Sequence, residues 1–227
     1  MESATKPVID LITVKTTLPV YPLLPNCERK TFRTERLSMR PMTEGDFDFC
    51  RAVRTDPDGM KWSSKGRPDI DIEETRANFN SRLPPNDVQK YDWVICLLET
   101  GEPIGIGGTC LWTSELGWPS VGYIFLKAHW GKGYASEFLK AFLDEWWSLP
   151  RNEVELAVDK NSIRDGDGEV KKECLSAITV SENAPSQNVL RKCGFAFTSS
   201  WPEVDANDPP QEVILNGFVG RKGEVIV

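Results

Sequence analysis

The stretch that decides the fold is VGYIFLKAHWGKGYASEFLKAFLDEWW, residues 121–147. It begins with strand character over 121–126, passes through a glycine-rich turn at 130–135 and continues as an amphipathic helix, which Pro150 ends. A strand that turns directly into a helix aims unpaired backbone N–H groups and the positive end of the helix dipole at one point. The stretch therefore predicts an anion site suited to a pyrophosphate, where glycines leave the backbone uncovered.

The composition is that of a soluble globular protein. The 227 residues are 40% hydrophobic and 27% charged, and the net charge of −7 with no Lys/Arg-rich block argues against a nucleic-acid partner. No apolar run is long enough to span a membrane, and no secretory signal pattern opens the chain. Six cysteines without a CxxC pair and a single histidine make a metal site unexpected, and we expect a cytosolic or nuclear protein with reduced thiols.

Predicted strands and helices alternate along the rest of the chain. Residues 1–30 contain four prolines and are expected to be an extended arm, either packed or loose, before a single domain over 31–227. The expected strands cover 37–40, 91–98, 104–111, 121–126, 154–158 and 174–180, with closing strands near Trp201 and at 213–219. The expected helices cover 43–54, 72–83 and 134–147, and a short one follows Asn183. This order predicts a mixed α/β sheet covered by helices.

Three motifs, in order, resemble those of the GNAT superfamily of N-acetyltransferases. The strand, the turn WGKGYA (130–135) and the helix resemble its acetyl-CoA-binding motif A. Residues 183–195, NAPSQNVLRKCGF, resemble its motif B, and residues 35–41, ERLSMRP, resemble its usual first strand. The variant WGKGYASE is most similar to the branch that includes the Rim-type ribosomal-protein acetyltransferases. The resemblance covers residues 34–219.

The resemblance implies a fold, a cofactor and a set of site residues. The implied fold has three layers, with a central mixed, mostly antiparallel twisted sheet of about six or seven strands and helices on both faces. The implied cofactor is acetyl-CoA, with CoA as product, and the residues assigned to it are Phe125, Leu126, Trp130, Gly131, Lys132, Gly133, Tyr134, Ala135 and Asn183. Amides of 131–135 would hold the pyrophosphate, and backbone groups of Phe125 and Leu126 would pair with the pantetheine arm.

The implied catalytic residues are Ser186 and Asn183. Ser186 would protonate the departing thiolate, because Leu190 stands where many relatives carry a tyrosine for that role. Asn183 would contact the pantetheine, and it is also a well-suited N-cap before Pro185. Both roles are compatible, since a capping residue can present its amide to a ligand.

The general base of the family is missing at its usual place. Ser120 stands where many relatives carry a glutamate, and a serine alone cannot deprotonate an amine at neutral pH. Either another carboxylate serves, or the amine loses its proton to solvent, or the protein is a poor catalyst. The carboxylates to inspect are Glu115, Asp92 and Glu182.

Other conspicuous residues have structural interpretations. We interpret His129 as structural and Trp146 and Trp147 as core. Residues 150–173, longer than the family leads us to expect, form either a substrate lid or a decorated edge of the sheet. The aromatic residues that could line an acceptor site are Trp62, Trp93, Trp112, Trp118 and Tyr123.

The sequence thus predicts an acetyl-CoA-dependent N-acetyltransferase that acts by direct attack in a ternary complex. The acceptor is a primary amine, on a protein N-terminus or a small molecule, and the acidic chain favours a cationic one. A monomer or homodimer without nucleic-acid or membrane partners is expected. The alternative, suggested by Ser120, is a non-catalytic acyl-CoA-binding module or sensor.

Overall fold

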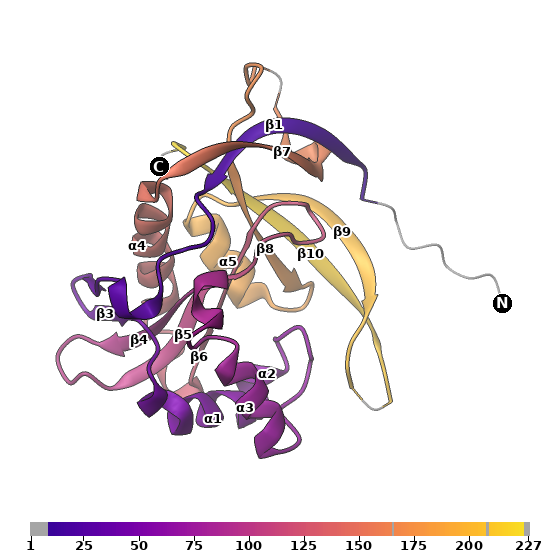
Figure 1. Ribbon diagram of the computed structural model, residues 1–227. Coiled ribbons are helices and arrows are strands. Elements are labelled where there is room, and N and C mark those ends of the chain that lie inside the picture. Colours follow the sequence, from indigo (N-terminus) through magenta and orange to yellow (C-terminus); the bar gives the residue numbers. More distant parts are fainter. Residues whose placement is uncertain (1–8, 165, 208, 225–227) are drawn as a thin grey trace. The chain divides into compact units, whose positions relative to one another are not determined.

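The computed structural model describes residues 9–164, 166–207 and 209–224 (Figure 1). The first eight residues of the expected arm, and Asp165 and Asp208 in two expected loops, lie outside this range. Contacts group the described residues into two compact units. The first unit comprises residues up to 19, 111–120 and 150 onward, and the second unit comprises 20–110 and 121–149. That residues 31–227 act as one domain stays a prediction.

The second unit is built on strands in the order β2-β3-β4-β5-β6. Their bounds are β2 Phe32–Arg33, β3 Leu37–Arg40, β4 Tyr91–Leu97, β5 Pro103–Leu111 and β6 Ser120–Phe125, of which the end residues Leu111 and Ser120 belong to the first unit. The pairs β2–β3, β3–β4 and β4–β5 are antiparallel, and the β4–β5 register shifts between Ile95 and Cys96. β4 and β5, which the sequence predicts as strands, form a hairpin whose turn contains Gly101.

Helices cover both faces of this sheet. Successive residues of its strands point to opposite faces, and both faces carry apolar side chains that must be buried. Val94, Cys96 and Ile106 point to one face and form a core with Cys50 of α1 (Phe47–Thr55) and Phe79 of α3 (Ile72–Asn80). On the other face, Tyr91 lies against Phe142 and Trp146 of α4 (Tyr134–Ser148). The short helix α2 (Pro57–Met60) lies beside β6, since a Cβ on Gly59 would meet Ile124 Cδ1 at 3.3 Å.

Local sequence explains where these helices begin and end. Thr43 and Asp46 form a capping box, although a 3₁₀ turn over Glu44–Asp46 precedes α1. Helix α3 ends at Asn80 rather than at the predicted residue 83, because the chain tightens into i→i+3 bonds such as Leu83 N–H to Asn80 O. Leu83 nevertheless stays buried.

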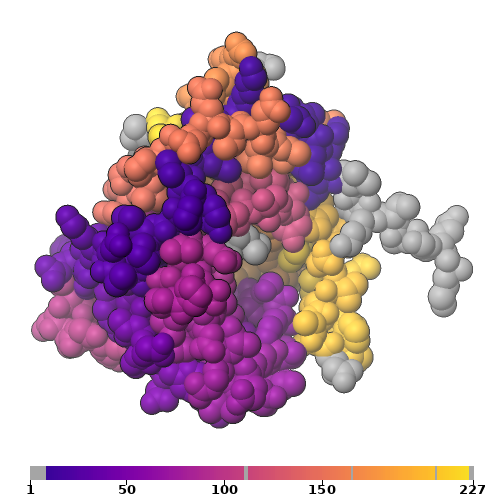
Figure 2. Space-filling view, in the orientation of Figure 1, coloured from indigo at the N-terminus to yellow at the C-terminus, as the bar shows by residue number. Residues whose placement is uncertain are grey.

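The first unit contains two sets of strands. β8 (Cys174–Val180), β10 (Glu212–Arg221) and β9 (Ala196–Val204) are antiparallel in the order β8-β10-β9, and Ser120 pairs with Ser176 of β8 in parallel. A separate ribbon joins β1 (Leu11–Pro19) to β7 (Arg151–Asp159), which lie side by side in indigo and orange at the surface (Figure 2). Helix α5 (Ala184–Lys192) lies against β8.

The ribbon resolves two open expectations. Residues 11–19 of the expected arm are extended, as predicted, and packed by hydrogen bonding to β7 rather than loose. The same pairing makes 151–159 a strand, which favours a decorated edge over a lid for this part of 150–173. Trp118, Val158, Cys174 and Trp201 form the core of the unit.

Both units together are mixed α/β with mostly antiparallel strands, as the sequence predicts. Within the described ranges, no helix combines the length and apolar character that crossing a lipid bilayer requires.

Candidate active site

The turn between β6 and α4 has a backbone that only glycine adopts readily. Gly131 has φ 73° and Gly133 has φ 82°, both in the left-handed region. Gly133 is the N-cap residue of α4, so the first amides of that helix follow it directly. A Cβ built on Gly131 would meet nothing within 4 Å, so the space in front of the turn is open. The turn, whose residues 131–133 are exposed, thus offers a helix N-terminus and the access that an anion needs.

Two contacts fix the strand end that leads into the turn. The Leu126 amide donates to the Ile104 carbonyl at 3.0 Å, which commits it to the neighbouring strand β5. Adjacent residues of a strand point their backbone groups to opposite edges, so Phe125 presents its N–H and C=O to the other edge. There the Trp130 indole Nε1 donates to the Phe125 carbonyl at 2.7 Å. Of the two predicted pantetheine contacts, Phe125 is thus the one whose backbone faces away from β5.

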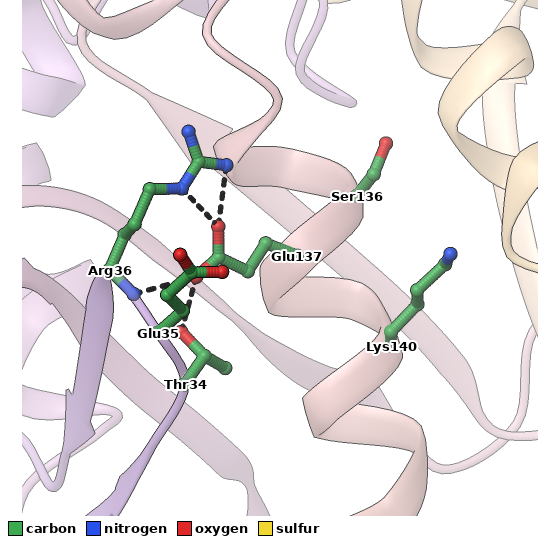
Figure 3. A pocket seen from close by; sticks show the side chains of 6 residues that line it. All are labelled: Thr34, Glu35, Arg36, Ser136, Glu137 and Lys140. Carbon is green, nitrogen blue, oxygen red and sulfur yellow. Dashed lines mark hydrogen bonds and ion pairs between the residues drawn. The ribbon is translucent and has the colours of Figure 1, made fainter.

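A polar pocket of about 570 Å³ lies beside α4 and is lined by Thr34, Glu35, Arg36, Ser136, Glu137 and Lys140 (Figure 3). The Arg36 guanidinium donates from Nε to Glu137 Oε2 at 2.7 Å and from Nη1 to the Lys132 carbonyl at 3.0 Å. It also lies over the Tyr134 ring, 4.8 Å from the centroid. Arg36 therefore ties the chain before β3 to both the turn and the helix.

Glu137 is the partner that holds Arg36 in place. Its Oε1 accepts hydrogen bonds from Thr34 Oγ1 at 2.5 Å and from the Arg36 amide at 2.9 Å. Burial alone would raise the pKa of Glu137, but the bonds from Thr34, the Arg36 amide and the Arg36 guanidinium outweigh it and lower the pKa below its ordinary value. Glu137 is therefore a carboxylate near neutral pH.

Asn183 and Ser186 lie together at the start of α5 in the first unit. Asn183 Oδ1 accepts from the Ser186 amide at 3.2 Å, so the predicted N-cap is confirmed. The Asn183 side-chain NH₂ donates to no partner among the described residues, which leaves it available to a ligand. Gly194, with φ 81°, follows the C-cap residue Cys193 and ends the helix, and Phe195 returns to the core.

The candidate bases differ in their surroundings. Ser120 is 5% exposed and lies in the strand. Asp92 is buried, and its Oδ2 lies 2.9 Å from Arg82 Nε, so its charge is already paired. Glu115 and Glu182 are exposed. Within the described ranges, no cluster of His, Cys, Asp and Glu could hold a metal ion.

The remaining predicted residues divide between core and surface. Trp146 is buried, as expected, and the His129 side chain is 11% exposed with its ring 6.4 Å from that of Tyr134. Trp93 and Trp118 are fully buried, so they belong to the core and do not form acceptor walls. Of the other candidates for acceptor walls, Trp62, Trp112 and Tyr123 are half-buried. Trp147, which was expected in the core, is also only half-buried.

The structure brings the predicted residues 125–135 together in the second unit and adds Thr34, Arg36 and Glu137 to them. Sequence reasoning passed over these three as site residues. Two signals were available: the ERLSMRP stretch, which supplied a strand and no role for Arg36, and the WGKGYASE stretch, whose last residue is Glu137 but which supplied no role for it.

Comparisons with known proteins agree with this geometry. The family model described as an acetyltransferase (GNAT) domain matches residues 36–196. A Bacillus licheniformis protein called uncharacterized N-acetyltransferase p20 is 32% identical over 135 residues, which is 57% of this chain and 74% of the relative.

Solved structures share the fold at low sequence identity. The acetyltransferase of Agrobacterium tumefaciens has a TM-score of 0.57 at 23% identity, covering 84% of this chain and 94% of that one. The spermidine N-acetyltransferase of Vibrio cholerae, solved with CoA and spermine, has a TM-score of 0.61 at 15% identity, covering 83% of this chain and 97% of that one. With a family match over more than half of its length, the chain belongs to the GNAT acetyltransferases, a family of acetyl-transferring enzymes.

Proposed function

We propose that this protein transfers the acetyl group of acetyl-CoA to a primary amine, with the cofactor pyrophosphate on the turn 131–135. The observation that carries the proposal is the open, positive-φ glycine turn at the N-terminus of α4, in a chain of this family. A pyrophosphate fits this turn because left-handed glycines expose their amides without a covering side chain. The CoA bound to the spermidine N-acetyltransferase with this fold supports the same cofactor.

The acceptor is proposed to be a small or protein-borne amine, with a cationic one favoured. The chain carries a net charge of −7, which attracts cations from solution. A spermidine N-acetyltransferase among the proteins of this fold supports an amine acceptor in general. We propose that the amine reaches its neutral form through solvent. Ser120 is buried in the strand, Asp92 is held by Arg82, and Glu115 and Glu182 are exposed to solvent.

The chain's own residues orient the reaction and return a proton. Acetyl-CoA supplies the thioester whose acetyl group forms the new C–N bond as the C–S bond breaks. Phe125 would offer its backbone N–H to the pantetheine, and Asn183 would offer its side-chain amide. Ser186 Oγ–H would give its proton to the departing thiolate and regain one from solvent. The attacking nitrogen carries one proton too many once the C–N bond has formed, and it would release that proton to solvent.

Turnover tests this function against the CoA-binding module. The protein is incubated with acetyl-CoA and a panel of polyamines, amino-acid amines and peptide N-termini while free thiol is followed. We expect saturable thiol release that depends on both substrates. Saturable CoA binding with no release above background on the whole panel would favour the module, and a melting temperature raised by ATP but not by CoA would refute the cofactor.

Ser186→Ala is expected to lower kcat about tenfold, because a thiolate is a good leaving group and gains only part of the usual benefit of general acid catalysis. The dissociation constant of CoA should not change. Steady-state kinetics and a CoA titration measure the two effects, with Ser148→Ala at the exposed end of α4 as the control. An unchanged kcat in Ser186→Ala would remove Ser186 from the catalytic residues.

A further inference from the structure

Arg36 has no part in the proposed transfer step, yet its guanidinium reaches the middle of the cofactor turn. Its Nη1 donates to the Lys132 carbonyl at 3.0 Å, and its Nη2 lies 3.4 Å from where a Cβ on Gly133 would be. No other residue in the described part of the chain is shown bonded to that carbonyl. The contact joins the start of β3 to a turn almost a hundred residues later in the sequence.

Bonding this carbonyl determines where the next amide points. In a planar trans peptide the C=O and the following N–H point in opposite directions. The bond from Arg36 to the Lys132 carbonyl therefore turns the Gly133 N–H away from Arg36 and fixes its direction. Gly133 at φ 82° rotates freely enough that its amide needs such an anchor.

The guanidinium is itself held rigidly, and its charge is already matched. Nε and Nη2 both contact Glu137 Oε2, at 2.7 and 2.6 Å, and the ring of Tyr134 lies beneath. Glu137 is fixed in turn by Thr34 and by the Arg36 amide (Figure 3). An arginine paired in this way acts mainly by holding its hydrogen-bond partners in place, since the neighbouring carboxylate cancels most of its attraction for a phosphate.

We propose that Arg36 is a positioning residue for the cofactor: through the Lys132 carbonyl it orients the Gly133 amide toward the pyrophosphate. This inference rests on the proposed function, because it concerns the same turn. It predicts that Arg36 affects only the binding of ligands that carry the pyrophosphate. It also predicts that the several N–H donors of the guanidinium contribute more to this binding than its charge does.

Two substitutions separate geometry from charge. Arg36→Met removes both, and Arg36→Lys keeps the charge but cannot bond Glu137 and Lys132 together. We expect each to raise the KM for acetyl-CoA about tenfold, the usual effect of losing a hydrogen bond to a charged group, with kcat within twofold of the wild type. Lys140→Met, which removes a cation from the same pocket without a bond to the turn, should leave KM within about twofold.

A truncated donor distinguishes positioning from general damage to the fold. S-acetylpantetheine lacks the pyrophosphate, so its kcat/KM should be equal in the wild type and both Arg36 variants. A merely structural role would lower kcat/KM for both donors. Urea unfolding of each variant checks the fold, and Arg36→Lys carries the test if Arg36→Met does not fold.

The outcomes distinguish this inference from the function on which it rests. A wild type that binds no CoA would overturn the proposed function and this inference with it. If the wild type binds CoA and Arg36→Lys has the same KM for acetyl-CoA as the wild type, only the inference about Arg36 would be overturned. Equal losses with acetyl-CoA and S-acetylpantetheine would also overturn it.

Discussion

Gly131→Val weakens CoA binding by about a hundredfold or more, whereas Gly101→Val leaves it unchanged, if the turn 131–135 holds the pyrophosphate. Gly131 has φ 73°, and a β-branched side chain there forces the backbone out of the left-handed region. The amides of the turn then no longer point together, and the new side chain stands in the open space before them. Calorimetric titration with CoA measures the loss.

Gly101 is a closely matched control for this change. It also has φ 73°, it also has nothing within 4 Å of a Cβ, and it lies in the turn between β4 and β5 of the same unit. Valine therefore introduces the same backbone strain at both positions, and urea midpoints should fall by similar amounts. Equal CoA affinity in the two variants would mean that the phosphates bind elsewhere.

Phe138→Ala lowers the free energy of unfolding by about 3–5 kcal/mol, the usual cost of truncating a buried phenylalanine. Phe138 is fully buried on α4, with its ring edge-on to those of Tyr123 and Phe125 in β6. A Cβ on Gly107 of β5 would lie only 2.5 Å from Phe138 Cε1, so this glycine leaves the room that the ring fills. Phe138 therefore packs α4 against both β5 and β6, the strand that leads into the turn.

Urea unfolding followed by tryptophan fluorescence measures this loss. The same truncation at Phe197, which is 54% exposed, should cost less than about 1 kcal/mol. A Phe138→Ala cost as small as that of Phe197→Ala would show that α4 is not held by this contact. Phe138→Leu, which retains most of the apolar volume, should fall between the two.

Local patterns were sufficient to predict most of the secondary structure. Apolar spacing located α4, and Pro150 gave its end, because both act within a few residues. Glycines within a strand indicate a bulge or a close neighbour, and Cβ atoms on Gly105, Gly107 and Gly108 of β5 would meet Ile124 O, Phe138 and Tyr91 O within 3 Å. The Asn183 cap was equally predictable from its type and the proline after it.

Contacts between distant segments were beyond such patterns. Arg36 and Glu137 are a hundred residues apart, and no local rule connects a residue before one strand to the first turn of a later helix. Trp93 and Trp118 were candidates for acceptor walls because aromatic residues serve both cores and binding sites. Only their burial places them in the core. The sequence showed that Ser120 cannot act alone as a general base, but it did not predict that this side chain is buried in the strand.

The most direct test of the account is a single turnover with acetyl-CoA labelled in the acetyl group, using the best amine from the thiol-release panel. Mass spectrometry of the amine after incubation measures the transfer. The account predicts that the wild type and Gly101→Val give labelled N-acetyl product in one-to-one proportion with free CoA, and that Gly131→Val gives almost none. Labelled product formed equally by Gly131→Val, or thiol released by the wild type without an acetylated amine, would contradict it.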